Sequence, residues 1–279
     1  MASVVLACAC TFSPVVNAAE TVESLRYGVS LYHFYQRDYF NALTELMVGQ
    51  SEDSLGNHAG GAELLRGGMA LSYGMDREAE TIFTRLLDDN EHNVDADQAW
   101  FYLGKLAWQR GDAARTSTTL ARMDEHYDGG LRNEALYLQA SAHLALGDSD
   151  AGLAHLAALP EDSYWRAYLN YNLGAQAAGF EDWGLAEHYF SAVTFDEQYN
   201  PETAALRDKS MTARGYAHLA AGDFDFAGDA FRQVTLEGTS APRALLGYGW
   251  AYAEGGDYLA ALTPWQTLSE RSLLEPSAR

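Results

Sequence analysis

Residues 100–120, WFYLGKLAWQRGDAARTSTTL, contain the motif from which the fold is predicted. Gly104 is followed by the pair Gly111-Asp112 and then by the apolar residue Leu120. The same order of a small residue, a turn and a bulky apolar residue recurs along the chain. Its seven turn residues are Asp38, Met75, Asp112, Asp148, Asp182, Asp223 and Asp257. Repetition of this kind predicts one supersecondary unit that stacks against its own neighbours.

Small residues recur at one position before each turn and at one position after it. The first set is Ser30, Gly67, Gly104, Ala140, Gly174, Gly215 and Gly249. The second set is Ala42, Ala79, Thr116, Gly152, Ala186, Ala227 and Ala261, each followed four residues later by Leu46, Phe83, Leu120, Leu156, Phe190, Phe231 or Trp265. Glycine within a helix costs about 1 kcal/mol relative to alanine, so its recurrence indicates a packing role. We expect two helices to cross closely at these positions, with the bulky residue filling the space between units.

The turns have a composition that suits the end of one helix and the start of another. Four of them are the pairs Gly111-Asp112, Gly147-Asp148, Gly222-Asp223 and Gly256-Asp257. Glycine adopts the left-handed conformation that ends a helix. Aspartate then caps the next helix by accepting a backbone N–H. The sequence therefore predicts a helix–turn–helix unit.

These features resemble the tetratricopeptide repeat, a helix–turn–helix unit of about 34 residues. The resemblance extends over roughly residues 22–273, although the proline that closes the consensus unit is absent. It implies an all-α fold, a right-handed α-solenoid in which about seven helix pairs stack over residues 19–279. Two local departures are expected, a first helix lengthened within residues 195–210 and a kink at Pro264. No polar closing helix follows the last unit, so we expect either a continuation beyond Arg279 or a partner that covers the end.

Residues 1–18 are uncharged and apolar and end in Val16-Asn17-Ala18. Small residues at these last positions suit cleavage by signal peptidase after Ala18, which predicts an exported, periplasmic protein. There is no basic segment ahead of the apolar run, which indicates a truncated signal or a misplaced start. The alternative is that residues 1–18 form an apolar first helix of a cytoplasmic protein.

Cys8 and Cys10 both lie within this first segment. Leu6-Ala7-Cys8 weakly resembles a bacterial lipobox, so a lipid anchor on Cys8 is the alternative to plain secretion. Cleavage after Ala18 would leave a mature chain with no cysteine, and therefore with no disulfide and no thiol chemistry.

Composition excludes several classes of function. The formal net charge is −21, which disfavours binding to nucleic acid or to an anionic membrane surface. No segment reads as a membrane-spanning helix. None of the common catalytic or nucleotide-binding motifs is present, so we expect no enzymatic activity, no metal and no cofactor.

In the tetratricopeptide repeat, the concave groove is lined by the first helix of each unit. The register above places these candidates there: Phe101, Lys105, Tyr137, Tyr168, Tyr171, Lys209, Tyr216, Arg243 and Trp250. Aromatic rings offer contact area at low entropic cost, and basic groups orient an acidic partner.

Two functions remain open. The first is an exported scaffold that binds a protein or peptide segment in this groove. The second is the non-catalytic solenoid of a cell-wall, lytic or polysaccharide-export assembly, in which the rings would contact a glycan.

Overall fold

The structure, a computed structural model, describes residues 24–89, 94–195 and 201–271. These residues form fourteen α-helices and one 3-10 helix (Gly56–His58), and they contain no β-strand. The α-helices are α1 (Leu25–Tyr35), α2 (Tyr39–Ser51), α3 (Ala59–Ser72), α4 (Asp76–Asp89), α5 (Val94–Gln109), α6 (Ala113–Leu120), α7 (Arg132–Ala145), α8 (Ser149–Ala158), α9 (Tyr164–Gly179), α10 (Trp183–Ser191), α11 (Pro201–Ala221), α12 (Phe224–Arg232), α13 (Ala241–Glu254) and α14 (Tyr258–Glu270). The all-α prediction is confirmed. The expected signal peptide and both cysteines lie outside the described residues.

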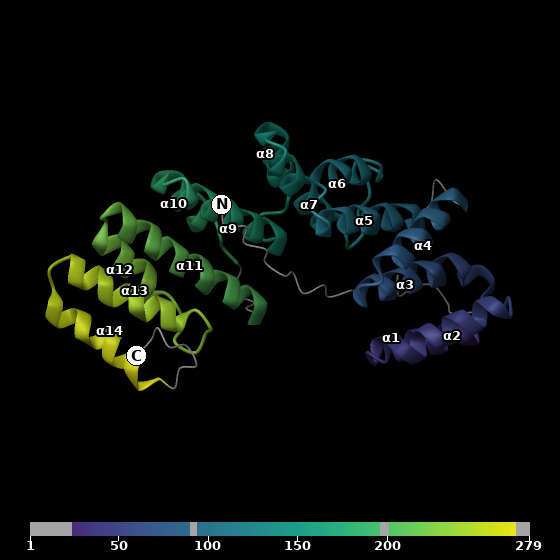
Figure 1. The fold of residues 1–279 in the computed structure, drawn as a ribbon, viewed down its shortest axis with the longest axis horizontal. Coiled ribbons are helices and arrows are strands. Elements are labelled where there is room, and N and C mark those ends of the chain that lie inside the picture. The colour runs from purple at the N-terminus through teal and green to yellow at the C-terminus, as the bar shows by residue number, and fades with distance from the viewer. Residues whose placement is uncertain (1–23, 90–93, 196–200, 272–279) are drawn as a thin grey trace. The chain divides into compact units, whose positions relative to one another are not determined.

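The chain divides into two compact units, residues 1–155 and residues 156–279, and the division falls within α8. In the first unit α1 packs on α2, α3 on α4 and α5 on α6. In the second unit α9 packs on α10, α11 on α12 and α13 on α14 (Figure 1).

Consecutive helix pairs also stack on one another within each unit. The second helix of a pair contacts the first helix of the next pair, as α4 contacts α5 and α12 contacts α13. First helices contact one another in the series α3, α5, α7 and in the series α9, α11, α13. The predicted solenoid of helix–turn–helix units is therefore present in each part.

The small residues of the first helices lie against the bulky residues of the second helices, as the sequence predicts. A Cβ atom added to Gly215 would lie 2.6 Å from Cε1 of Phe231, and one added to Gly174 would lie 2.7 Å from Cδ1 of Phe190. The same contact joins Gly67 with Phe83, Gly104 with Leu120, and Gly249 with Trp265. Only a residue without a side chain permits this approach, so the recurrent glycines have a packing role.

The turns follow the prediction with one exception. Gly222 ends α11 with a φ of 85°, in the left-handed region that glycine adopts without strain. Asp112 and Asp182 cap their helices by accepting the backbone N–H of Arg115 and of Leu185, at 2.9 and 3.1 Å. Asp223 occupies the cap position of α12, but its side chain accepts no backbone N–H there. The capping prediction is wrong for Asp223, whose carboxylate lies 3.7 Å from Nδ1 of His218.

Two helices depart from the regular repeat. The first helix α11 is lengthened to 21 residues, as expected, and it begins at Pro201, where a missing N–H costs nothing. The second helix α14 continues through Pro264 to Glu270. No helix of the described residues combines the length and the apolar character needed to cross a bilayer.

Replacing Gly215 with alanine tests the close contact between paired helices. Because the added methyl group meets the ring of Phe231, we expect Gly215→Ala to lower the free energy of unfolding by about 1–3 kcal/mol. Gly184 of α10 is the matched control, since the nearest atom to an added Cβ is 3.9 Å away. Gly184→Ala should raise stability by about 0.4–1 kcal/mol. Urea denaturation followed by circular dichroism measures both, and a neutral or stabilising Gly215→Ala would contradict the packing role.

Candidate functional site

The predicted groove residues all lie on first helices, but they fall in two separate units. Phe101 and Lys105 of α5 and Tyr137 of α7 belong to the first unit. The others belong to the second unit: Tyr168 and Tyr171 of α9, Lys209 and Tyr216 of α11, and Arg243 and Trp250 of α13. Each set is therefore considered by itself.

In the first unit the two predicted aromatic residues are buried within the protein. Phe101 is 0% exposed and Tyr137 is 7% exposed. The ring of Phe101 packs edge-on against that of Tyr102, with centroids 5.1 Å apart. Both rings are buried, so neither offers a ligand the contact area that the register predicts for it.

Lys105 is also satisfied within the first unit. Its Nζ lies 2.7 Å from Oε1 of Glu134, and both side chains are largely buried. An ion pair of this kind neutralises the positive charge. The described residues of this part of the groove therefore offer an acidic ligand neither a free ring nor a free cation at the predicted positions.

In the second unit, four predicted residues meet. The Nζ atom of Lys209 lies over the ring of Tyr171, 4.7 Å from its centroid. The hydroxyl of Tyr216 donates a hydrogen bond to the backbone oxygen of Arg243 at 2.9 Å. We call Tyr171, Lys209, Tyr216 and Arg243 the groove cluster. It brings together side chains from α9, α11 and α13.

The two cations of the groove cluster have no anionic partner. Among the residues that the structure describes, no carboxylate oxygen lies within 4.0 Å of Lys209 or Arg243. Three other arginines of the same unit do have such a partner, namely Arg207, Arg214 and Arg232. The groove cluster is therefore locally electropositive in a strongly acidic chain.

The pKa values in the cluster reflect burial and charge repulsion. Burial lowers the pKa of the Lys209 amine, and the positive charge of Arg243 lowers it further. Burial raises the pKa of the phenols of Tyr171 and Tyr216, while Arg243 acts in the opposite direction. A ligand anion would relieve the repulsion between the two cations.

Two further predicted residues flank the groove cluster on the same helices. Tyr168 stacks on Tyr164 with centroids 6.0 Å apart. Trp250 is 46% exposed and packs edge-on against Trp265. An exposed indole held by a second ring is a preordered contact surface.

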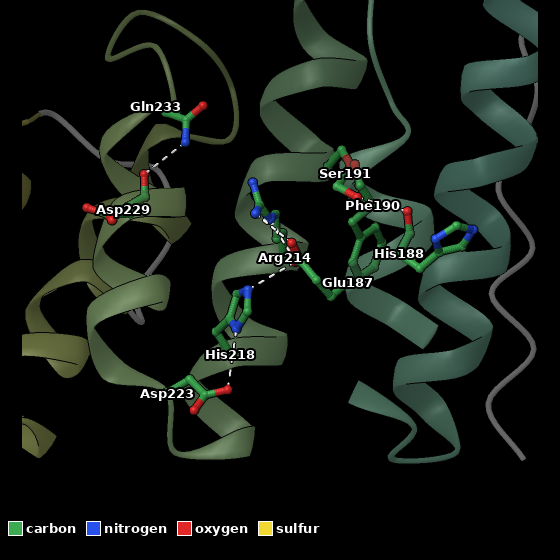
Figure 2. A network of polar contacts seen from close by, with 10 residues as sticks. Glu187, His188, Phe190, Ser191, Arg214, His218, Asp223, Asp229 and Gln233 are labelled. Atoms are coloured by element: carbon green, nitrogen blue, oxygen red, sulfur yellow. Dashed lines mark hydrogen bonds and ion pairs between the residues drawn. The ribbon is translucent and has the colours of Figure 1, made fainter. Parts of the chain in front are cut away.

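Sequence reasoning missed a polar cluster that joins consecutive repeats. Figure 2 shows Glu187 of α10 between Arg214 and His218 of α11. Arg214 forms two hydrogen bonds to this carboxylate at 2.7 and 2.5 Å, and Nε2 of His218 lies 3.0 Å from it. Nδ1 of His218 lies 3.7 Å from Asp223. We call Glu187, Arg214, His218 and Asp223 the His218 cluster.

The same positions form a related contact in the first unit. Oγ of Ser117 lies 3.1 Å from Nε2 of His143, whose Nδ1 lies 3.3 Å from Asp148. A serine, a histidine and an aspartate in series are the arrangement of a hydrolase nucleophile. However, Ser117 and Glu187 each lie five residues after a capping aspartate, Asp112 and Asp182, so both occupy one position of the repeat. Because glutamate replaces serine there, we interpret both clusters as contacts between repeats.

One sequence signal for these clusters is the spacing of histidine and aspartate. A histidine precedes the turn aspartate by five residues in three repeats, at His33, His143 and His218. Among the described residues, no group of three or more histidine, cysteine, aspartate or glutamate side chains could hold a metal ion.

Comparison with known proteins supports the repeat assignment. The family model of the tetratricopeptide repeat matches residues 77–116 and 212–271. The fold is similar to the crystal structure of a tetratricopeptide repeat protein from Parabacteroides merdae ATCC 43184, with a TM-score of 0.57 and 11% identity over 91% of this chain and 94% of that one. A chain of the APC/C hetero-tetramer Cut9–Hcn1 aligns with a TM-score of 0.48 and 17% identity over 92% of this chain and 52% of that one. No curated protein sequence matches the chain.

The chain therefore contains tetratricopeptide repeats, at residues 77–116 and 212–271, within a fold similar to that of a tetratricopeptide-repeat protein. Proteins of this class are typically non-catalytic scaffolds that bind other proteins. The side chains best suited to bind a partner protein are therefore the charged and aromatic ones that have no ion-pair partner within the fold.

Replacing Glu187 with glutamine tests the contact between repeats. Arg214 would lose its charged partner and His218 a charged acceptor, so we expect the free energy of unfolding to fall by about 1–2 kcal/mol. Asp229→Asn is the matched control, because the Asp229–Arg232 pair is exposed on both sides and should contribute little. Chemical denaturation measures both variants. Equal losses of unfolding free energy in the two variants would show that the His218 cluster stabilises the fold no more than an exposed ion pair does.

Proposed function

We propose that this protein is an exported, non-enzymatic scaffold that binds a segment of another protein along the first helices of its second unit. The observation that supports this most is the pair Lys209 and Arg243, two cations without a carboxylate partner in a chain of net charge −21. Three arginines of the same unit, Arg207, Arg214 and Arg232, do have a carboxylate partner. A cation without a carboxylate partner beside half-buried aromatic rings favours recognition of an anionic group.

The binding mode follows from the groove cluster. A carboxylate of the partner segment would accept hydrogen bonds from Lys209 and Arg243, and such charge-assisted bonds are the stronger kind. Tyr171 and Tyr216 would supply flat, preordered contact area beside it, and Trp250 would extend that area along α13. The acidic remainder of the surface would repel acidic partners that do not reach the groove.

Selection of short random-sequence peptides on the whole chain tests this assignment. We expect the selected peptides to be rich in aspartate and glutamate. The double variant Lys209→Gln/Arg243→Gln should bind the best of them at least roughly tenfold more weakly, as measured by fluorescence anisotropy. Tyr171→Ala and Trp250→Ala should also weaken binding while helicity is unchanged.

Arg232→Gln is the control for the loss of one positive charge, because Arg232 lies outside the groove cluster and pairs with Asp229. Affinity should also fall as the pH is raised, and this fall should begin at a lower pH than the usual pKa of a lysine. The reason is that the pKa of Lys209 is lowered, and the deprotonated amine no longer attracts an anion. Unchanged affinity in the double variant would overturn the assignment. Binding of glycans in place of peptides would instead favour a cell-wall or polysaccharide-export assembly.

The proposal of export is supported by the uncharged apolar residues 1–18 and the small residues that precede Glu20. We expect expression of the whole chain in a Gram-negative bacterium to yield a periplasmic protein whose N-terminal residue is Ala19. Sequencing of the purified protein by Edman degradation measures this. A cytoplasmic protein that retains its first residues would contradict export. A lipid on Cys8 would indicate a membrane-anchored form.

A further inference from the structure

The first unit contains a cavity that plays no part in the proposed groove. It has a volume of about 230 Å³ and lies against α7, the loop that follows α6, and His155 of α8. Leu120, Met123 and Leu136 supply apolar walls. A space of this size is smaller than the usual site of a metabolite or drug, and it suits a single side chain.

The loop that forms one wall is held in place by specific hydrogen bonds. The backbone N–H of Asp124 donates to Oδ1 of Asp97 at 2.8 Å. Nη1 of Arg132 donates to the carbonyl oxygens of Glu125 and Tyr127 at 3.0 and 2.7 Å. The cavity is therefore formed before any ligand arrives, which lowers the entropic cost of binding.

Two polar side chains line the cavity without a hydrogen-bond partner. These are the amide of Gln139 and the imidazole of His155, for which the described residues provide no such bond. Burial lowers the pKa of His155, and the stacked ring of His143, 5.4 Å away, lowers it further. Near neutral pH the imidazole is therefore uncharged. The interior offers neutral donors and acceptors beside apolar walls.

Asp124 and Glu125 line the cavity and form what we call its mouth, together with Arg132. The side chains of Asp124 and Glu125 are 64% and 86% exposed. Nδ1 of the exposed His126 ring lies 3.5 Å from Asp124 and 3.6 Å from Glu125. The two hydrogen bonds of Arg132 are directed to backbone carbonyls instead. The carboxylates are thus available to a positive group from outside.

We propose that this cavity binds an aromatic side chain of a partner protein, with an adjacent lysine or arginine of that partner placed over Asp124 and Glu125. Leu120, Met123 and Leu136 would enclose the ring, and Gln139 or His155 would bond its polar atom. Aromatic anchors in preformed pockets are typical of interfaces in which few residues dominate the affinity. The ligand has the opposite charge to the one proposed for the groove cluster, so this is a second and independent site.

Matched short peptides test the proposal directly. The chain has six methionines, so the methyl spectrum of protein labelled at methionine is simple, and Met123→Leu assigns the signal of Met123. N-acetyl-Trp-Lys-amide should shift that signal in a saturable manner. N-acetyl-Trp-Glu-amide should bind roughly tenfold more weakly, because the two exposed carboxylates repel it. N-acetyl-Ala-Lys-amide, which has no ring, should leave the signal unmoved.

Charge variants test whether Asp124 and Glu125, and not the acidic surface in general, cause the preference for the lysine-containing peptide. In the double variant Asp124→Asn/Glu125→Gln, the two tryptophan peptides should bind with nearly equal affinity. Glu161→Gln/Asp162→Asn, an exposed acidic pair that precedes α9, should leave their ratio unchanged. Lys209→Gln/Arg243→Gln should not alter the Met123 shift, which distinguishes this site from the groove. Absence of a saturable shift, or equal binding of both tryptophan peptides to the unaltered chain, would overturn the proposal.

Discussion

The contact between a glycine of the first helix and a bulky apolar residue of the second helix is the constraint on which the repeat depends. At Gly215 and Gly174 a single added carbon would overlap the facing phenyl ring. Helices that approach this closely bury their facing surfaces completely, and Phe190 is 1% exposed. The conformational cost of glycine within a helix, about 1 kcal/mol, is offset by that burial.

Once the pairs are formed, polar contacts fix how one pair meets the next. The position five residues after the turn residue reaches the following repeat in both units. Glu80 pairs there with Arg110 and Arg115, Ser117 contacts His143, and Glu187 contacts Arg214 and His218. The pKa of Glu80 is held below its usual range chiefly by its hydrogen bond with Arg110, so the charged form prevails near neutral pH. One repeat position therefore connects neighbours by whichever polar chemistry its residue provides.

The distribution of charge separates the surfaces with a proposed binding role from those that hold the fold together. Lys105 is neutralised by Glu134, whereas no carboxylate of the described residues lies within 4.0 Å of Lys209 or Arg243. The cavity of the first unit is instead lined by two exposed carboxylates, those of Asp124 and Glu125. A protein with sites of opposite charge can recognise two different segments, and this suits a scaffold.

The helix–turn–helix unit could be predicted from the sequence, because the spacing of Gly104, Gly111-Asp112 and Leu120 reflects contacts between helices adjacent in the chain. It also predicted a groove that includes Tyr171, Lys209 and Arg243, since the register of a repeated helix places them on equivalent faces, and this binding role stays a prediction. Only the tertiary structure showed that Phe101 and Tyr137 are buried, that Glu134 neutralises Lys105, and that a cavity lies beside His155. The exposure and charge of a side chain depend on neighbours from other helices, and no spacing within one repeat specifies which neighbours those are.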